Sequence, residues 1–137
     1  MSPRADSRSL AAVSRIWEPR LADTSIWLDH LRGTGTDLRD SLDTGGVFIH
    51  PFIIGELACG HMKNRSEVIG LLRQLPTVPY ATDDEALRFI ETHGLMAKGI
   101  GYIDVHLLAS VALSTGVRLR TLDRRLASVA SELGLAA

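Results

Sequence analysis

The feature that most constrains this chain is the segment 20–28, which reads RLADTSIWL. A short apolar pair ends at Asp23, two hydroxyl residues follow, and the apolar residues after them recur at helical spacing. This order predicts a strand that ends at a carboxylate and a helix that begins directly after it, with Thr24 or Ser25 as its cap. In open α/β sheets, binding sites form outside the carboxyl ends of the strands. Taken alone, Asp23 is best explained as a capping residue, so a functional interpretation needs further acids in similar positions.

Strand and helix patterns alternate along the rest of the chain. Short apolar runs predict strands at 47–50, 78–80 and 117–121, and helical periodicity covers 52–58, 66–75, 82–93, 102–113 and 123–133. A capping box, with Thr82 at the cap and Glu85 three residues later, opens the third of these helices, so Asp83 and Asp84 are interpreted as structural. The alternation predicts an α/β domain in three layers, with a mostly parallel central sheet of four to five strands flanked by helices.

The length of 137 residues fits one domain, which we expect to span residues 20–137. Residues 1–19 are polar, unpatterned and end in Pro19, so they predict an N-terminal extension, flexible or not native to the domain, and no signal peptide. No apolar run is long enough to cross a bilayer, which argues against a membrane partner. Cys59 is the single cysteine, which excludes a disulfide framework and favours a reduced, cytoplasmic setting.

Four acids occupy comparable positions after strands or at the beginnings of helices: Asp23, Glu56, Asp104 and Asp123. Asp104 alone is explained by capping, and Glu56 is explained as well by an exposed helix face as by function. If the four converged at one end of a sheet they would repel one another, and a divalent cation would relieve that repulsion. Oxygen ligands with retained waters suit Mg²⁺ or Mn²⁺, which predicts metal-assisted hydrolysis of a phosphate ester. The five histidines show no zinc-site spacing.

Four arginines surround Asp123, namely Arg118, Arg120, Arg124 and Arg125. Such a cluster is usually a solvated face. The formal charge of the chain is −1, and it becomes about +3 once the four acids are assigned to a metal site, so a basic rim could bind an RNA backbone.

With these residues in hand, the chain resembles a PIN-domain ribonuclease of the VapC toxin type. The matching segments are 22–27 (ADTSIW), 50–58 (HPFIIGELA), 99–108 (GIGYIDVHLL) and 121–126 (TLDRRL), and they occur in family order. The resemblance implies that Asp23, Glu56, Asp104 and Asp123 converge on Mg²⁺ or Mn²⁺, with Thr121 as a helper near the metal. The chain departs from the family pattern at residues 18–20, where Glu-Pro-Arg shortens the first strand.

The resemblance also implies the activity and the partners. The expected enzyme is an endoribonuclease that hydrolyses RNA to a 5′-phosphate and a 3′-hydroxyl, as the toxin of a type II toxin–antitoxin system. We expect a homodimer neutralised by a VapB-like antitoxin, and surplus apolar residues predict a docking groove near the helices that begin at Phe52 and Ser66.

Three alternatives remain open from the sequence. The first is an acid-rich metal phosphatase, although Asp23-Thr24-Ser25 lacks the second acid of a phosphoaspartyl motif. The second is a PIN-like nuclease outside toxin–antitoxin systems, including one that acts on DNA. The third is a catalytically silent PIN-like binding module, against which the presence of all four acids argues.

Overall fold

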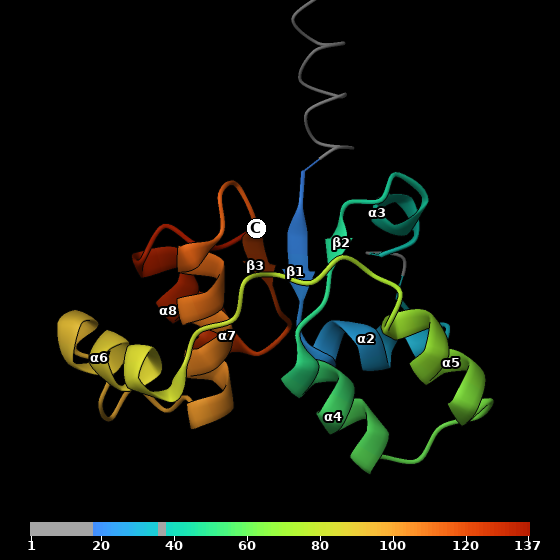
Figure 1. Ribbon diagram of the computed structural model, residues 1–137, viewed down its shortest axis with the longest axis horizontal. Helices are drawn as coiled ribbons and strands as arrows, with labels where there is room; N and C mark the ends of the chain where they lie inside the picture. Colours follow the sequence, from blue (N-terminus) through green and yellow to red (C-terminus); the bar gives the residue numbers. More distant parts are fainter. Residues whose placement is uncertain (1–17, 36–37) are drawn as a thin grey trace, which may run out of the picture.

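The central sheet is parallel and connected by helices. The computed structural model describes residues 18–35 and 38–137, so most of the predicted extension 1–19 lies outside the described residues. Strands β1 (Arg20–Ala22), β2 (Val47–Phe48) and β3 (Arg118–Arg120) are hydrogen-bonded in the order β2-β1-β3, all parallel. The strands run downward in Figure 1, so their carboxyl ends meet at the lower edge of the sheet. This is the edge at which the sequence predicts a site.

Single parallel bridges extend the sheet on both sides. Ile49, just beyond β2, pairs with Thr77, and Leu119 of β3 pairs with Ala136 near the C-terminus. Among the described residues the sheet therefore has three strands, fewer than the four to five predicted, with one isolated bridge beyond each edge. The predicted α/β class and parallel sheet are confirmed, but the extended piece at 78–80 forms no full strand.

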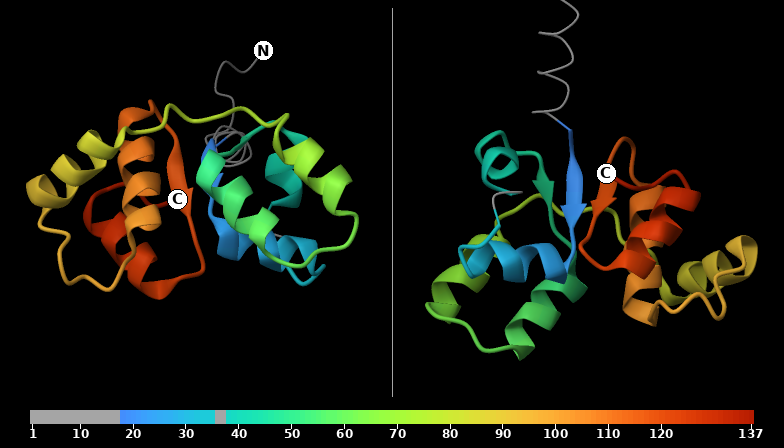
Figure 2. Two further views of the ribbon diagram at one scale, coloured as in Figure 1. Left: turned by 60° about the horizontal axis from the view of Figure 1, so that its bottom comes forward. Right: turned by 180° about the vertical axis from the view of Figure 1, so that it is seen from behind.

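The helices cover the sheet from two sides. The structure gives α2 (Thr24–Leu31), α3 (Arg39–Asp43), α4 (Pro51–Cys59), α5 (Arg65–Leu72), α6 (Asp83–His93), α7 (Tyr102–Leu113) and α8 (Arg124–Glu132). Helices α6, α7 and α8 lie on the β3 side, and α2, α4 and α5 lie on the β2 side (Figures 1 and 2). Parallel strands require such long crossover connections, which is why every strand here is followed by a helix. None of the helices among the described residues is long and apolar enough to cross a membrane.

The core forms where both helical layers meet the strands. Its largest fully buried apolar side chains come from strands and helices alike, and they are Leu21, Ile26, Leu38, Val47, Ile49, Ile53, Leu107, Leu108, Leu119 and Leu126. Helix α7 is buried over most of its length, because it packs against both β3 and α6. This packing fixes the beginning of α7 beside the carboxyl ends of the strands.

Local signals set the helix ends much as the sequence predicts. Thr82 and Glu85 form the reciprocal capping box of α6, with hydrogen bonds of 3.1 and 3.0 Å. That helix ends at Gly94, whose φ of +63° is a left-handed conformation that glycine adopts without steric cost. Helix α5, in contrast, ends at Leu72 and not at Leu75, so its last predicted turn is irregular.

Candidate metal centre at the carboxyl ends of the strands

Asp23 is the most tightly held carboxylate of the four. It follows β1 directly, and only 6% of its surface is exposed. One carboxylate oxygen, Oδ1, accepts hydrogen bonds from the Ser25 hydroxyl and from the Ile26 backbone N–H, so Asp23 does cap α2. The other, Oδ2, accepts a hydrogen bond from the Thr121 hydroxyl. Capping and the proposed functional role are therefore compatible in this residue.

Two hydroxyl residues connect the end of β1 to the loop after β3. The Ser25 hydroxyl accepts a 2.9 Å hydrogen bond from the Leu122 N–H, and the buried Thr121 hydroxyl accepts a 3.0 Å hydrogen bond from the Asp123 N–H. Each hydroxyl also donates to Asp23. The two loops are thus held together through the Asp23 carboxylate, and Thr121 has a positioning role that fits the predicted helper.

Asp104 lies in the first turn of α7, half-buried, where its Oδ2 accepts a 3.2 Å hydrogen bond from the Gly101 N–H. Burial raises its pKa above the ordinary value for an aspartate. The negative charges of Asp123, Asp23 and Glu56 raise the pKa further, while the hydrogen bond from Gly101 partly offsets them. The other three predicted acids are therefore close enough to Asp104 for their charges to act on it, and their convergence on one metal ion stays a prediction.

Glu56 and Asp123 are the more exposed members of the set. Glu56 Oε1 accepts a 2.8 Å hydrogen bond from the Thr24 hydroxyl at the beginning of α2, which ties α4 to the β1 end. Asp123 caps α8, with Oδ1 accepting a 3.0 Å hydrogen bond from the Leu126 N–H. In each of these two carboxylates, the second oxygen accepts no hydrogen bond from the described residues.

The donor set fits a cation that keeps most of its waters. Within residues 18–35 and 38–137, no group of three or more acidic, histidine or cysteine side chains is arranged so that it could hold a metal ion by itself. The four carboxylates come from separate elements, and the charges of the other three raise the pKa of Asp104. Mg²⁺ and Mn²⁺ prefer oxygen ligands, and Mg²⁺ binds through one or two carboxylates plus water, so an open arrangement suits them.

The predicted arginines divide into two groups. Arg118 lies at the amino end of β3, where it donates a 2.7 Å hydrogen bond to the Gly134 carbonyl, so the structure does not bring it to the carboxylates. Arg120 is partly buried and donates to the Thr121 carbonyl. Arg124 and Arg125 are exposed in the first turn of α8, beside Asp123. The latter two are the better placed of the four to meet a substrate backbone.

The sequence did not predict a hydrogen-bonded cluster of Asp83, Tyr102 and His106. Asp83, interpreted above as a structural acid in the first turn of its helix, accepts a 2.9 Å hydrogen bond from the Tyr102 hydroxyl and lies 3.0 Å from His106 Nε2. Tyr102 and His106 are four residues apart in α7, and their rings pack edge to face at 4.7 Å. The i, i+4 spacing of the two rings was the available signal, but nothing in the sequence paired them with Asp83.

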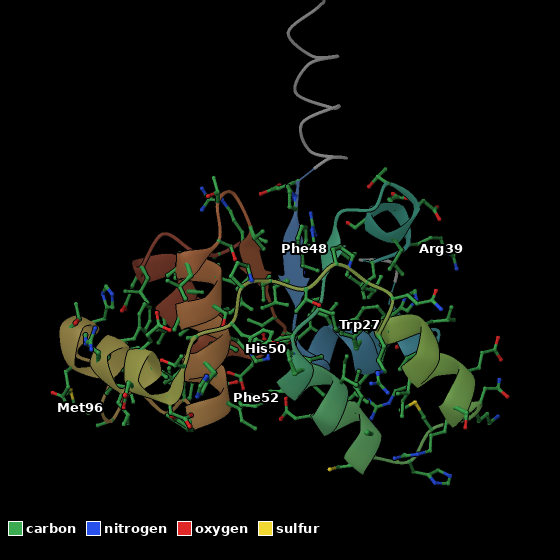
Figure 3. All side chains as sticks on the ribbon, in the orientation of Figure 1. Trp27, Arg39, Phe48, His50, Phe52 and Met96 are labelled. Atoms are coloured by element: carbon green, nitrogen blue, oxygen red, sulfur yellow. The ribbon has the colours of Figure 1, made fainter. Side chains whose placement is uncertain are left out.

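A second missed residue is His50, which precedes α4. Its Nδ1 accepts a 3.0 Å hydrogen bond from the Phe52 N–H, so the imidazole is the cap of this helix. The side chain is 1% exposed, and burial, with a smaller contribution from the nearby charge of His106, lowers its pKa from 6.5 to about 4. Figure 3 shows His50 and Phe52 between α4 and α7.

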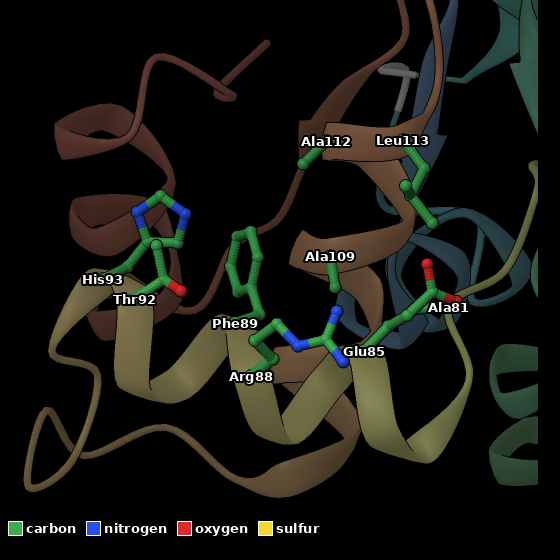
Figure 4. Close-up of a pocket in the computed structure, with 9 residues that line it drawn as sticks. All are labelled: Ala81, Glu85, Arg88, Phe89, Thr92, His93, Ala109, Ala112 and Leu113. Atoms are coloured by element: carbon green, nitrogen blue, oxygen red, sulfur yellow. The ribbon is translucent and has the colours of Figure 1, made fainter.

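Two hollows lie away from the carboxylates. An apolar groove of about 450 Å³ is lined by α2, α5 and Leu42, with Trp27, Leu31, Val68 and Leu71 among its walls. This groove involves the helix of Ser66 and is not lined by α4, the helix of Phe52, and the place where a partner docks stays a prediction. A smaller cavity of about 230 Å³ lies between α6 and α7, and Phe89 is one of the residues that line it (Figure 4).

Comparison with known proteins defines the family to which this chain belongs. The model of the PIN domain family matches residues 20–132, and the chain therefore belongs to that family. Two relatives are both named Ribonuclease VapC32, one from Mycobacterium tuberculosis strain CDC 1551 / Oshkosh and one from strain ATCC 25618 / H37Rv. Each is 42% identical over 116 residues, which cover 85% of this chain and 94% of the relative. The resemblance to VapC-type ribonucleases is confirmed.

Proposed function

We propose that this protein is a metal-dependent endoribonuclease that acts as the toxin of a toxin–antitoxin system. The observation that carries the proposal is the placement of Asp23 directly after β1, of Asp123 directly before α8 and of Asp104 in the first turn of α7, all within a PIN domain. The relatives named Ribonuclease VapC32 support RNA as the substrate. A silent binding module would have no need to keep four mutually repelling acids together.

Each acid has a defined part in the proposed centre. Asp23 and Asp104 would hold Mg²⁺ or Mn²⁺ directly, because both are wholly or partly buried and each is fixed by hydrogen bonds. Glu56 and Asp123 are exposed and would act through water. When bound, the cation supplies positive charge that offsets the carboxylates, polarises the scissile phosphate and lowers the pKa of water.

The residues of the chain orient the substrate around this centre. A water oxygen attacks phosphorus while the bond to the 3′-oxygen breaks, which leaves a 5′-phosphate and a 3′-hydroxyl. Thr121 and Ser25 hold Asp23 in place through both of its oxygens, so that the carboxylate does not rotate during the step. Arg124 and Arg125 provide positive charge for the flanking phosphates.

Cleavage assays with the purified chain test the proposal. A panel of tRNA and rRNA fragments should be cut in Mg²⁺ or Mn²⁺, remain intact in EDTA, and carry 5′-phosphate ends. Asp23→Asn and Asp104→Asn should abolish cleavage and also remove the rise in melting temperature that Mg²⁺ gives the wild type. RNA cleavage that persists in EDTA, or Mg²⁺ stabilisation that is equal in both variants, would contradict the proposed centre.

The antitoxin would occupy the groove between α2 and α5. Its walls are apolar and Leu71 is 58% exposed, which suits the apolar face of an amphipathic helix. Leu71→Glu should weaken the complex with the antitoxin encoded beside this gene, because a charge would be buried on docking. Leu87→Glu, at an exposed leucine of α6, serves as the matched control. Equal binding by both variants would exclude the groove.

We also propose a cytoplasmic homodimer. Exposed apolar side chains outside the groove, such as Met96 and Leu113, supply surface for contact with a second copy. Light scattering of the purified chain should give twice the monomer mass of 14.9 kDa. A monomer at micromolar concentration would refute this part and leave the nuclease proposal intact.

A further inference from the structure

A cavity of about 600 Å³ lies beside the proposed metal centre and has no role in the account so far. It is lined by the beginnings of α4 and α6, by His106 of α7, and by the segment between α5 and α6. Phe52 and Tyr80 contribute aromatic rings that are 39% and 58% exposed. Phe52 is one helical turn before Glu56 in α4, so the cavity and the carboxylates share one face of that helix.

Two residues that line this cavity, His50 and His106, each have a buried imidazole nitrogen (His50 Nε2 and His106 Nδ1) with no hydrogen-bond partner among the described residues. The residues are 1% and 2% exposed. A buried polar atom without a partner costs free energy, so such atoms in a native protein usually mark a bound water or a ligand.

The hydrogen bonds of the two rings fix what each free nitrogen offers. His50 Nδ1 accepts from the Phe52 N–H, so in the neutral ring the proton is on Nε2, which is a donor. His106 Nε2 faces the Asp83 carboxylate, an acceptor, so Nε2 carries the proton and Nδ1 of the neutral ring is an acceptor. When both rings are neutral, the wall of the cavity therefore holds one donor and one acceptor that have no partner among the described residues.

We propose that this cavity binds one nucleobase of the single-stranded RNA substrate, stacked on Phe52 and Tyr80 and held at its edge by His50 and His106. A base edge carries an acceptor beside a donor, which complements the two nitrogens. Aromatic side chains stack on bases in single-stranded RNA, where the edges are open to hydrogen bonding. The inference rests on the proposed function, since the backbone of the same strand would pass over the carboxylates.

The rings are already packed as a platform. His50 and Phe52 have centroids 4.9 Å apart, and Phe52 lies equally close to His106. His50 also contacts Tyr80 at 5.7 Å. Phe52 thus stands between the two histidines, and its partial exposure leaves a face for stacking. A site organised in this way would select the base beside the cleavage position and would not set the rate of the chemical step.

Binding and cleavage of RNA by matched variants test the inference. Phe52→Leu and Tyr80→Leu remove a ring at exposed positions and keep an apolar side chain. His50→Asn keeps a cap for α4 but replaces the imidazole and its Nε2–H by a shorter amide. Phe89→Leu, in the separate cavity between α6 and α7, is the control for loss of an aromatic ring. Circular dichroism checks the fold of each protein.

The probes are fluorescein-labelled RNA hexamers of defined sequence for anisotropy in EDTA, and a random RNA pool in Mg²⁺ whose cleaved ends are sequenced. Phe52→Leu should weaken hexamer binding roughly 5- to 100-fold, the range for loss of one stacked base. His50→Asn should flatten the base preference at one position next to the cut. Phe89→Leu should match the wild type in both assays.

The outcomes separate the two proposals. If the wild type neither binds nor cleaves RNA, the proposed function fails. If it does both and the three cavity variants behave like Phe89→Leu, the nucleobase site is refuted and the nuclease stands. If the cavity variants change only the oligomeric mass of the protein in solution or its binding to the antitoxin, the cavity serves a protein partner and the inference is overturned.

Discussion

Acidification from pH 6.5 toward pH 4 should destabilise this protein, because the buried His50 resists protonation in the folded state. The folded pKa of His50 is about 4, whereas the unfolded chain has the ordinary value of 6.5. Between these values the unfolded state binds the proton and the folded state does not. The contribution of the neutral ring to stability is therefore complete above pH 6.5 and is lost as the pH falls toward 4.

The two pKa values give the size of the effect. Between pH 7.5 and pH 5, the linkage relation predicts a loss of about 2 kcal/mol from this one group. The total stability of a domain this size is on the order of 5–15 kcal/mol, so the loss is readily measured. The figure depends on the ring staying buried in the native state at pH 5, as its 1% exposure indicates.

Urea denaturation in EDTA, followed by circular dichroism, measures the loss. His50→Asn is the matched protein, because asparagine can accept the Phe52 N–H and carries no titrating proton. The charged groups that face His50, namely His106 and the Asp83 beyond it, are present in both proteins, so their contributions cancel. The wild type should lose about 2 kcal/mol more than His50→Asn between pH 7.5 and pH 5. Parallel losses in the two proteins would refute the assigned pKa.

Three further predictions concern the carboxylate centre. Asp104→Asn keeps the Gly101 cap and should raise the melting temperature of the metal-free protein, while RNA cleavage in Mg²⁺ falls at least roughly 100-fold; a lower melting temperature than wild type in EDTA would show that the acids do not repel one another. Thr121→Val removes a hydroxyl bonded to Asp23 and to the Asp123 N–H, and should cost about 1–3 kcal/mol in urea denaturation; full stability would contradict its positioning role. Gly99→Ala adds a Cβ 2.8 Å from Arg125 Cδ at a φ of +79°, and should weaken RNA binding as Arg125→Ala does; unchanged affinity would exclude Arg125 from the interface.

The strand-to-helix connections were predictable because short-range signals set them. The acid after β1, the capping box of α6 and the glycine after it all act within a few residues. The same reasoning located the four acids at the carboxyl edge of the sheet, since parallel topology brings strand ends together. The extent of the edge strands was harder to predict from the sequence, because their pairing depends on partners far away in the chain. Thr77 and Ala136 each pair only as a single bridge.

The side-chain partners of the site could not be predicted for the same reason. Ser25 has no motif around it, yet its hydroxyl connects Asp23 to the loop after β3. His106 lies two residues after Asp104 on the same helix, and its side chain meets Asp83 of α6. Both contacts join residues from different elements, and the sequence carries no periodicity that reports them.

The hydrogen bond between Asp23 and Thr121 joins residues 98 positions apart. During synthesis, a ribosome must therefore complete nearly the whole chain before the two loops can be fastened together. A product released early would carry Asp23, Glu56 and Asp104 without the hydroxyl that holds the first of them, and without Asp123. If the proposed centre is correct, truncated translation products would be inert toward RNA. Only completed chains would then cleave the RNA of the cell that makes them.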